Sequence, residues 1–172
     1  ALSDFYLEKL EASAITPKPL NENLFKNADL NSDGVWETTI YGGAEGDSKI
    51  ENGTAIFHLT KLGTDDWAPQ FKQVDLQIEQ GCTYRLSMNV NSTIARDIIF
   101  KVQQNGEPYT TYLQETKALS VGDNNINIEF TMKSASDARA LFCAAMGAQK
   151  ISDEHTLTFS NMSLVKIAEA IN

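Results

Sequence analysis

The stretch "TYRLSMNV", residues 83–90, alternates apolar and polar side chains at every second position. A period of two is typical of a β-strand with one buried face and one face toward solvent. The apolar positions are Tyr84, Leu86, Met88 and Val90, and the polar positions between them are Arg85, Ser87 and Asn89. Such a strand is stable in an antiparallel sheet that is covered on one face.

The same period recurs along most of the chain. It is found in "TAIFHLTKL" (54–62), "DIIFKVQQN" (97–105), "NINIEFTMK" (125–133) and "HTLTFSNMSLV" (155–165). Clusters of Asn, Gly and Asp separate these runs and indicate turns. No helix of ordinary length fits between residues 23 and 165. The sequence therefore predicts an all-β fold in which two antiparallel sheets pack as a sandwich of the jelly-roll kind.

The first twenty residues follow a different pattern. Apolar side chains in "LSDFYLEKLEAS" (2–13) have a helical spacing, and Pro17 and Pro19 then end any helix. We predict a helix and linker over residues 1–20, followed by one domain over residues 21–172. A chain of 172 residues is long enough for one sizeable core and short for two.

The charge composition argues against two classes of partner. The chain has 14 basic and 23 acidic residues, a net charge of −9, and its cations are scattered singly, as at Lys61, Lys72, Arg85, Arg96 and Lys101. A nucleic-acid binder needs a basic stripe, and an anionic membrane repels an acidic protein. The chain also has no apolar run long enough to span a membrane. We expect a neutral or cationic partner, and neither nucleic acid nor membrane.

Cysteine and histidine offer no metal site by their spacing. Cys82 and Cys143 lie far apart without a CxxC pair, and His58 and His155 are the only histidines. A zinc site needs four ligands in a compact arrangement. Two free thiols are the expectation, with a disulfide between Cys82 and Cys143 as the alternative, and the two histidines are expected to be incidental.

The turn "DLNSDG", residues 29–34, begins like an EF-hand calcium loop. An EF-hand needs a bidentate Glu at its twelfth position and a helix after it. That position is Ile40, and "VWETTIYGG" contains no helical run. The EF-hand is therefore excluded, and the stretch reads as a polar turn between strands.

Three segments combine aromatic and amide side chains where a strand face or loop meets solvent: "WETTIYGG" (36–43), "GTDDWAPQFKQ" (63–73) and "KVQQNGEPYTTYLQ" (101–114). Sugars present C–H groups on their faces and hydroxyls on their edges, so a sugar site needs flat aromatic rings beside hydrogen-bonding groups. The candidates are Tyr41, Trp67, Gln70, Gln104, Asn105, Tyr109, Tyr112 and Gln114. The alternative is that these aromatics pack in the core or within loops.

The order and spacing of these segments resemble the family 4/9 carbohydrate-binding modules of bacterial cellulases, xylanases and β-1,3-glucanases. The resemblance runs from about Asn23 to Val165. It is carried by "NLFKNADL" (23–30), Trp36, "NGTAIFHL" (52–59), "GTDDWAPQFKQ", "EQGCTYRLSMNV" (79–90), "ARDIIFKVQQNGEPYTTY" (95–112) and "HTLTFSNMSLV". It implies a jelly roll with an open cleft that binds single soluble glycan chains without cleaving them.

The resemblance also implies roles for single residues. Trp67 and Tyr109 match two facing platforms that sandwich a sugar ring, and Tyr41 matches a further platform. Gln70, Asn105 and Gln114 match positions that hydrogen-bond sugar hydroxyls, and Arg96 matches an arginine found in some members.

One strand departs from the family pattern. In "ARALFCAAMG" (138–147) the cleft-facing positions are Leu141, Cys143 and Ala145, where relatives carry polar side chains. The cleft floor then loses hydrogen-bonding partners. Either stacking and the other wall hold the ligand, or the cleft does not bind a glycan well. A Cys143 that faces the cleft is expected to react with thiol reagents.

The resemblance implies a structural calcium ion on the side opposite the cleft. Its matching ligands are the Asp29 carbonyl, Asn31, Glu51, the Thr54 carbonyl and Asn161. Asn31 and Asn161 stand where acidic residues are common, which removes charge from a site for a hard cation. Such an ion would act as a staple between strands and not as a switch.

The leading hypothesis is a non-catalytic module, secreted and monomeric, that brings an attached glycoside hydrolase to polysaccharide. The expected ligand is a β-1,4, β-1,3 or mixed β-glucan chain, with xylan second. One rival is a small glycoside hydrolase that uses two of Asp65, Asp66 and Glu107. The other is an interaction module whose apolar strand 141–145 packs against a neighbour, such as residues 1–20.

Overall fold

The computed structural model describes residues 15–171, so the predicted helix over residues 2–13 lies outside the described residues. Ten strands form the described part: β1 (Glu37–Thr39), β2 (Glu45–Glu51), β3 (Thr54–Lys61), β4 (Gln70–Ile78), β5 (Thr83–Ser92), β6 (Arg96–Gln103), β7 (Thr111–Leu119), β8 (Gly122–Thr131), β9 (Asp137–Ala145) and β10 (His155–Ala168). Residues 15–171 contain no helix, and so none that could cross a membrane.

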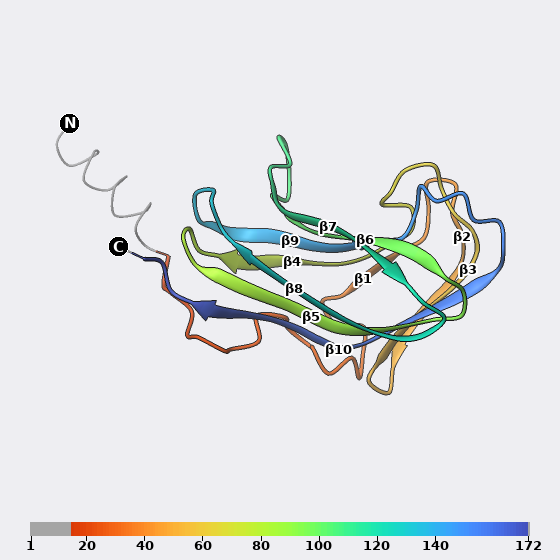
Figure 1. The fold of residues 1–172 in the computed structure, drawn as a ribbon, viewed down its shortest axis with the longest axis horizontal. Coiled ribbons are helices and arrows are strands. Elements are labelled where there is room, and N and C mark those ends of the chain that lie inside the picture. The colour runs from red at the N-terminus through yellow and green to blue at the C-terminus, as the bar shows by residue number, and fades with distance from the viewer. Residues whose placement is uncertain (1–14, 172) are drawn as a thin grey trace.

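The strands form two antiparallel five-stranded sheets that pack face to face (Figure 1). The front sheet has the order β1–β4–β9–β6–β7, and the back sheet has the order β2–β3–β10–β5–β8. From β3 onward the chain changes sheet at almost every turn, which is the jelly-roll connection pattern. The predicted all-β sandwich is confirmed.

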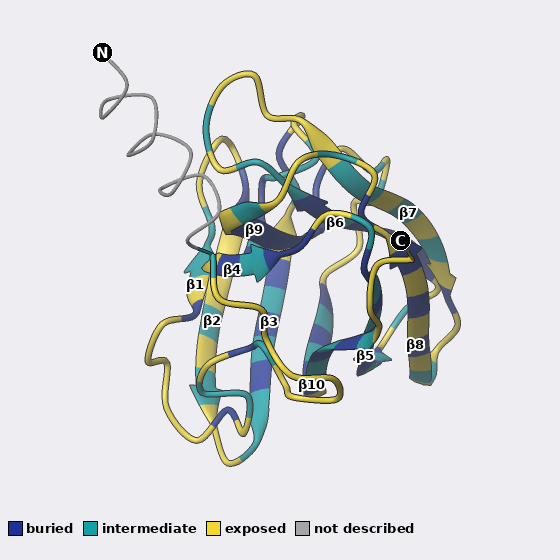
Figure 2. Cartoon of the chain, turned by 90° about the vertical axis from the view of Figure 1, so that its left-hand side faces the viewer, coloured by how far each residue is buried: buried dark blue, intermediate teal, exposed yellow. Residues whose placement is uncertain are grey.

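The core lies between the sheets and follows the predicted alternation. The even positions 84–90 of β5 are buried and the odd positions between them are partly exposed, a banding that Figure 2 shows along the strands. Aromatic rings join the two layers: the Phe71 ring from β4 lies 5.7 Å from Phe57 of β3 and 5.1 Å from Phe159 of β10. Edge and tilted contacts of this kind add to the stabilisation that burial provides.

The last strand changes its phase at a bulge. Leu157 and Phe159 are buried, and the buried positions continue at Met162 and Leu164. The pairing with β5 shifts between Ser160 and Ser163, and Asn161 has a φ of 56°. An extra residue in one strand lets both halves of β10 face the core.

Residues 15–24 lie along the sandwich without regular secondary structure. Gln77 Nε2 donates to the Thr16 carbonyl (2.6 Å), and the Lys18 backbone N–H donates to Glu79 Oε2 (3.0 Å). The Asn21 N–H then donates to the Lys166 carbonyl of β10 (2.9 Å). The described end of the predicted linker is thus attached to the front sheet at the end of β4, and the chain joins the back sheet at Asn21, where the predicted domain begins.

Candidate functional site

The outer face of the front sheet forms the floor of the candidate site. Its side chains alternate with the core residues Phe71, Phe100 and Phe142 of β4, β6 and β9. The register sets the floor residues in rows across β4, β9 and β6: Gln70–Ala145–Ile99, then Lys72–Cys143–Lys101, then Leu141–Gln103 on β9 and β6. Two lysines therefore flank Cys143 on one face of the sheet.

Two loops rise on the outer side of this sheet, from opposite ends of the floor (Figure 1). The loop at 62–69 leads into β4 and carries Trp67. Three backbone hydrogen bonds attach it to the chain after β9: Met146 N–H to Pro69 O (2.9 Å), Gly147 N–H to Asp66 O (2.8 Å) and Ala148 N–H to Gly63 O (3.0 Å). The loop is thus held in place by backbone contacts.

The second loop, residues 104–110, joins β6 to β7 and carries Tyr109. The Gln104 N–H donates to the Thr110 carbonyl (2.8 Å), and the Thr110 N–H donates back to Gln104 Oε1 (3.3 Å). The Tyr109 N–H donates to the Gly106 carbonyl (2.7 Å), and the Tyr109 side chain is 54% exposed. Gln104, predicted as a glycan contact, braces this loop.

A cavity of about 530 Å³ lies between the two loops. Four predicted residues meet there: Trp67, Gln70, Asn105 and Tyr109. The other lining residues are Lys72, Lys101, Gln103, Leu141 and Cys143. Aromatic rings, amides and ammonium groups thus face one space, and none of the lining residues is a carboxylate.

Tyr41 extends the aromatic surface beside the cavity. Its ring lies 5.3 Å from that of Trp67 at an interplanar angle of 51°, and its side chain is 58% exposed. Gly42 makes this packing possible, since a Cβ there would lie 2.9 Å from the Trp67 ring. Tyr41 and Trp67 together form one platform at the rim.

A second depression of about 460 Å³ adjoins the cavity at Asn105, which lines both. Gln104 and Tyr112 lie in this second depression. The Tyr112 hydroxyl donates to Asp137 Oδ2 (2.7 Å), and burial together with this carboxylate raises the pKa of Tyr112 to about 12. Gln114 pairs with Lys101 in the β6–β7 register, so it shares the cavity's face, but it is exposed at the edge strand.

Arg96 does not line the cavity, contrary to the prediction. Its side chain is 5% exposed, its Nη1 donates to His155 Nε2 (2.8 Å), and its Nη2 donates to the Met146 carbonyl. Burial lowers the pKa of Arg96 to about 10, which still leaves the guanidinium charged at neutral pH. Arg96 ties β6 to the start of β10, and His155 is a structural partner.

In β9, the side chains predicted to face the cleft do lie on the outer face of the sheet, but they are buried there and not open to solvent. Leu141, Cys143 and Ala145 are 7%, 3% and 1% exposed and pack with Val74 and Ile99. The Cys143 thiol donates to Gln70 Oε1 (3.0 Å). Burial raises its pKa to about 12. The assumed openness of the thiol is therefore wrong, because neighbouring side chains on the floor cover it, and slow reaction with thiol reagents is now expected.

Sequence reasoning missed Lys72, Lys101 and Gln103. In "QFKQ" and "IFKVQ" each lysine directly follows a core phenylalanine. The alternation of a strand therefore places both lysines on the outer face of the sheet, and this could have been predicted from the sequence. In the sequence they are nevertheless isolated cations, because nothing local shows that β4 and β6 flank the same strand. Lys101 Nζ lies 2.6 Å from Asp66 Oδ2, and Lys72 Nζ lies 3.8 Å from Glu37 Oε2.

The residues expected to bind calcium gather at one end of the back sheet. The Gly53 N–H donates to the Leu30 carbonyl (3.0 Å), which brings the turn at 29–34 against the β2–β3 turn. Thr54 begins β3 one residue before Ala55, the partner of Phe159, so it lies near the bulge at Asn161.

The donor side chains already have partners within the protein. Asn31 Nδ2 donates to Asp29 Oδ2 (3.1 Å), and Glu51 pairs with Lys49 (2.8 Å). The carbonyl and amide oxygens suit a hard cation, while Glu51 would have to exchange its lysine for the metal. Calcium at this position stays a prediction.

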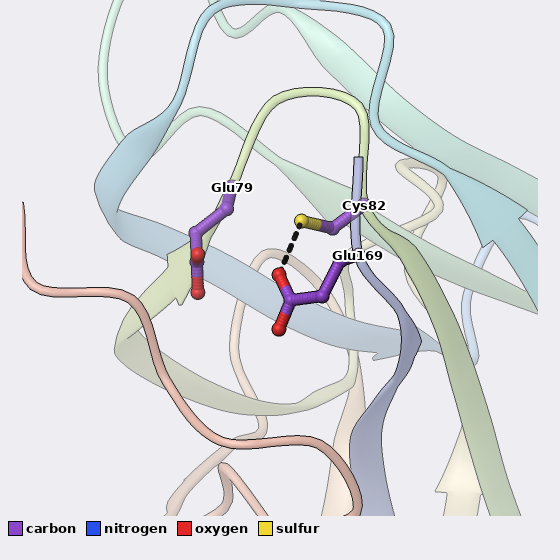
Figure 3. A group of neighbouring side chains, drawn as sticks. All are labelled: Glu79, Cys82 and Glu169. Atoms are coloured by element: carbon purple, nitrogen blue, oxygen red, sulfur yellow. Dashed lines mark hydrogen bonds between the residues drawn. The ribbon is translucent and has the colours of Figure 1, made fainter. Parts of the chain in front are cut away.

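A separate cluster of Glu79, Cys82 and Glu169 offers metal-ligand chemistry (Figure 3). The Lys166 ammonium already occupies it, with Nζ 3.1 and 3.2 Å from the two Glu79 oxygens and 3.1 Å from Glu169 Oε2. Burial alone would lower the pKa of Lys166, but the two carboxylates outweigh it and raise that pKa. The cluster is an internal ion pair in which lysine supplies the cation.

Comparison with known proteins gives one family and one fold. A family model for the family 4/9 carbohydrate binding domain matches residues 22–150. A search of curated proteins found no match. Solved structures share the fold: a CBM4 structure is 23% identical with a TM-score of 0.68, over 86% of this chain and 99% of that chain.

Two cellulose-binding domains of Cellulomonas fimi β-1,4-glucanase C have the same fold. The N-terminal domain is 22% identical with a TM-score of 0.65, over 89% of this chain and 99% of that one. The second N-terminal domain is 18% identical with a TM-score of 0.67, over 88% of this chain and 100% of that one. With the family model covering most of its length, the chain belongs to the family 4/9 carbohydrate-binding domains.

Proposed function

We propose that the cavity of the front sheet binds one glycan chain, and that the domain holds this chain without cleaving it. One observation carries the proposal: Trp67 and Tyr109 approach a single cavity from two loops, with Gln70 and Asn105 beside them. Aromatic faces match the C–H faces of sugar rings, and amides match the hydroxyl edges. The cavity adjoins a second depression, so a chain has room beyond one sugar.

A β-glucan backbone is the first expected ligand, in β-1,4, β-1,3 or mixed linkage, and a xylan backbone is the second. The two Cellulomonas fimi domains of the same fold are named as cellulose-binding, which supports a β-1,4-linked chain. The exposed platform of Tyr41 and Trp67 suits a chain that continues past the cavity.

Hydrolysis is disfavoured by the placement of the carboxylates. A glycosidase needs two carboxyl groups on either side of the scissile bond. Asp66 is held by the Lys101 ammonium at 2.6 Å, and neither Asp65 nor Glu107 lines the cavity. We therefore propose a binding role for these loops and no catalytic one.

A protein-interaction role is disfavoured by the floor itself. Leu141, Cys143 and Ala145 are almost fully covered by their own chain, so they offer no apolar patch. Residues 15–20 attach to the far end of β4, at Gln77 and Glu79, away from this floor.

In its biological setting, the domain would act through effective concentration. We propose that it is a monomeric part of a secreted glycoside hydrolase. By holding the polymer, it would raise the concentration of substrate near the attached catalytic domain without any new contact between the two.

Affinity electrophoresis against β-1,4-, β-1,3- and mixed-linkage glucans, xylan and mannan tests the binding role. Retardation by at least one glucan or by xylan is expected. No retardation in any gel would overturn the proposal. Release of reducing sugar from the same panel by the isolated domain would instead favour a hydrolase.

A further inference from the structure

The cavity is cationic although the whole chain is acidic. The chain carries a net charge of −9, but the charged residues that line the cavity are Lys72 and Lys101. They stand on either side of Cys143, on β4 and β6. A site for a neutral sugar does not require two ammonium groups on its floor, so these lysines call for a separate explanation.

The two lysines differ in their partners. Lys101 Nζ lies 2.6 Å from Asp66 Oδ2, which makes a charge-compensated pair. Lys72 Nζ is 3.8 Å from its nearest carboxylate, Glu37 Oε2, which is beyond hydrogen-bond distance. Within residues 15–171, the structure records no hydrogen bond from the Lys72 ammonium. Lys72 thus presents an ammonium with free donors to the cavity.

The surroundings strengthen the pull of Lys72 on an anion. Its side chain is 22% exposed, and it lies beside the buried outer-face residues of β9, which are Leu141, Cys143 and Ala145. Charges interact more strongly where protein displaces water, and an ammonium removed from water gains most from a charged acceptor. A carboxylate is the anionic group that a glycan chain most directly offers.

We propose that the cavity recognises a glycan that carries uronic acids, with Lys72 binding the carboxylate. The inference rests on the proposed function, because it presumes that this cavity holds a glycan. The Lys72 ammonium, which has only the long 3.8 Å pairing with Glu37, matches one carboxylate for each bound segment. The ligand class is therefore a sparsely acidic chain on a β-linked backbone and not a dense polyuronate, which the net charge of −9 would repel.

This assignment revises the expectation of a neutral or cationic partner. That expectation came from the total charge, which governs long-range attraction and repulsion. The contact itself depends on the local charges, and in this cavity they are positive.

The test compares glycans that differ only in the carboxylate. One pair is glucuronoxylan oligosaccharides before and after carboxyl reduction, and the other is a β-1,4-glucan oligosaccharide and its partly C6-oxidised form. Calorimetry gives the ratio of affinities within each pair. The wild-type domain is expected to prefer the acidic member of at least one pair by about threefold or more, the scale of a partly exposed ion pair.

Four variants assign the preference to Lys72. Lys72→Met should bring the ratio to about one, and Lys72→Arg, which keeps the charge, should preserve the preference. Glu37→Gln should increase it by removing the competing carboxylate. Lys61→Met makes the same charge change on β3 of the back sheet and should leave the ratio at its wild-type value.

The outcomes separate the two proposals. Equal binding of acidic and neutral members by the wild type, unchanged in Lys72→Met, would overturn the uronate inference and leave glycan binding standing. Binding of no member of either pair would overturn both. Should Lys72→Met fail to fold, two of the other variants still test the inference. The ratio of acidic to neutral affinity must stay high in Lys72→Arg and must rise in Glu37→Gln.

Discussion

At the scale of single residues, the position of the Trp67 ring depends on a glycine that does not line the cavity. Gly42 has a φ of +68°, and a Cβ there would lie 2.9 Å from the Trp67 ring. The sequence contains "YGG" but gives no hint that one glycine supports a ring 25 positions away. Its role appears only when the loop before β4 is placed beside it.

Replacing Gly42 by alanine should weaken glycan binding. The new methyl group would push the Trp67 ring out of its position, and the left-handed backbone would cost about 1 kcal/mol of stability. Gly43→Ala is the matched control, because it has a similarly positive φ of +93° but its Cβ would come no closer than 3.9 Å to another residue. Calorimetry with chemical denaturation should show both variants destabilised and only Gly42→Ala impaired in binding. Equal affinities would show that Gly42 does not support the platform.

His155 should make the stability depend on pH. Its Nδ1–H donates to the Asp153 carbonyl (2.9 Å), and Nε2 accepts from Arg96 (2.8 Å). The Arg96 contact requires the neutral ring, because a protonated Nε2 has no lone pair to accept with, whereas the Asp153 carbonyl can accept from either form of the ring. Burial, helped by the Arg96 charge, lowers the pKa of His155 below its ordinary value of 6.5. A lowered pKa means that the unfolded state binds the proton more readily. The free energy of unfolding should therefore fall as the pH drops below about 6.5.

Denaturant melts between pH 8 and pH 5 measure this dependence. His155→Gln cannot take up the proton and should show a flatter profile over that range, although its stability at pH 8 should be lower because a buried contact to Arg96 changes. Parallel profiles for the two proteins would mean that His155 is not the group responsible.

At the scale of strands and loops, the local sequence pattern determines which side chains face the core, whereas pairing between distant segments determines which strands are neighbours. The alternation in residues 83–90 and in the similar runs predicted which side chains face the core, and the structure confirms it for β3, β5, β6, β8 and β10. The order of strands in a sheet is set by pairings between distant segments. The row of Lys72, Cys143 and Lys101 joins three such segments, so no local pattern contains it.

The Lys101–Asp66 pair should hold the loop of Trp67 onto the sheet. Asp66 lies next to Trp67, and its carboxylate is 2.6 Å from Lys101 Nζ on β6. Lys101→Met should weaken binding of acidic and neutral glycans by a similar factor, about 1 kcal/mol or less for a partly exposed pair. This differs from Lys72, whose loss should affect the preference for the acidic member of a pair.

A double-mutant cycle with Asp66→Asn checks this role of Lys101. The two single variants and the double variant should show similar affinities, because each breaks the same pair. Lys117→Met is the control, since it breaks a partly exposed pair with Glu115 on β7 of the same sheet. Additive losses in the cycle would contradict a shared role in holding the loop.

Calcium, if bound at the end of the back sheet, should affect stability and not binding. Asn31, Glu51 and Asn161 would hold it together with the backbone carbonyls of Asp29 and Thr54. A ligand that binds only the folded state raises its stability, so a chelator should lower the melting temperature. Glycan affinity should stay the same, because Glu51, Thr54 and Asn161 belong to the back sheet and the cavity lies on the front sheet. A melting curve that does not respond to chelator would leave "DLNSDG" as a simple turn.

At the scale of the whole molecule, the sandwich follows from the sequence more directly than the site does. Period-two runs separated by turn residues are enough for two packed sheets, and the family resemblance supplied the cleft. The sequence predicts less well the exposure of side chains that are covered by residues distant in the chain. Arg96 looked like a sugar ligand and is buried against His155, and Cys143 looked open and is covered. Burial of a polar group is decided by partners that are distant in sequence.

The most direct test of glycan binding at this cavity removes its two platforms. Trp67→Ala and Tyr109→Ala should each weaken binding by about 1 to 3 kcal/mol, the usual contribution of a stacking aromatic. Tyr109→Phe keeps the ring and should retain most of the affinity. Calorimetry against the glycan with the strongest retardation in electrophoresis, paired with denaturant melts, measures both effects. Weaker binding with nearly wild-type unfolding is the predicted result, and unchanged affinity with a large loss of stability would contradict it.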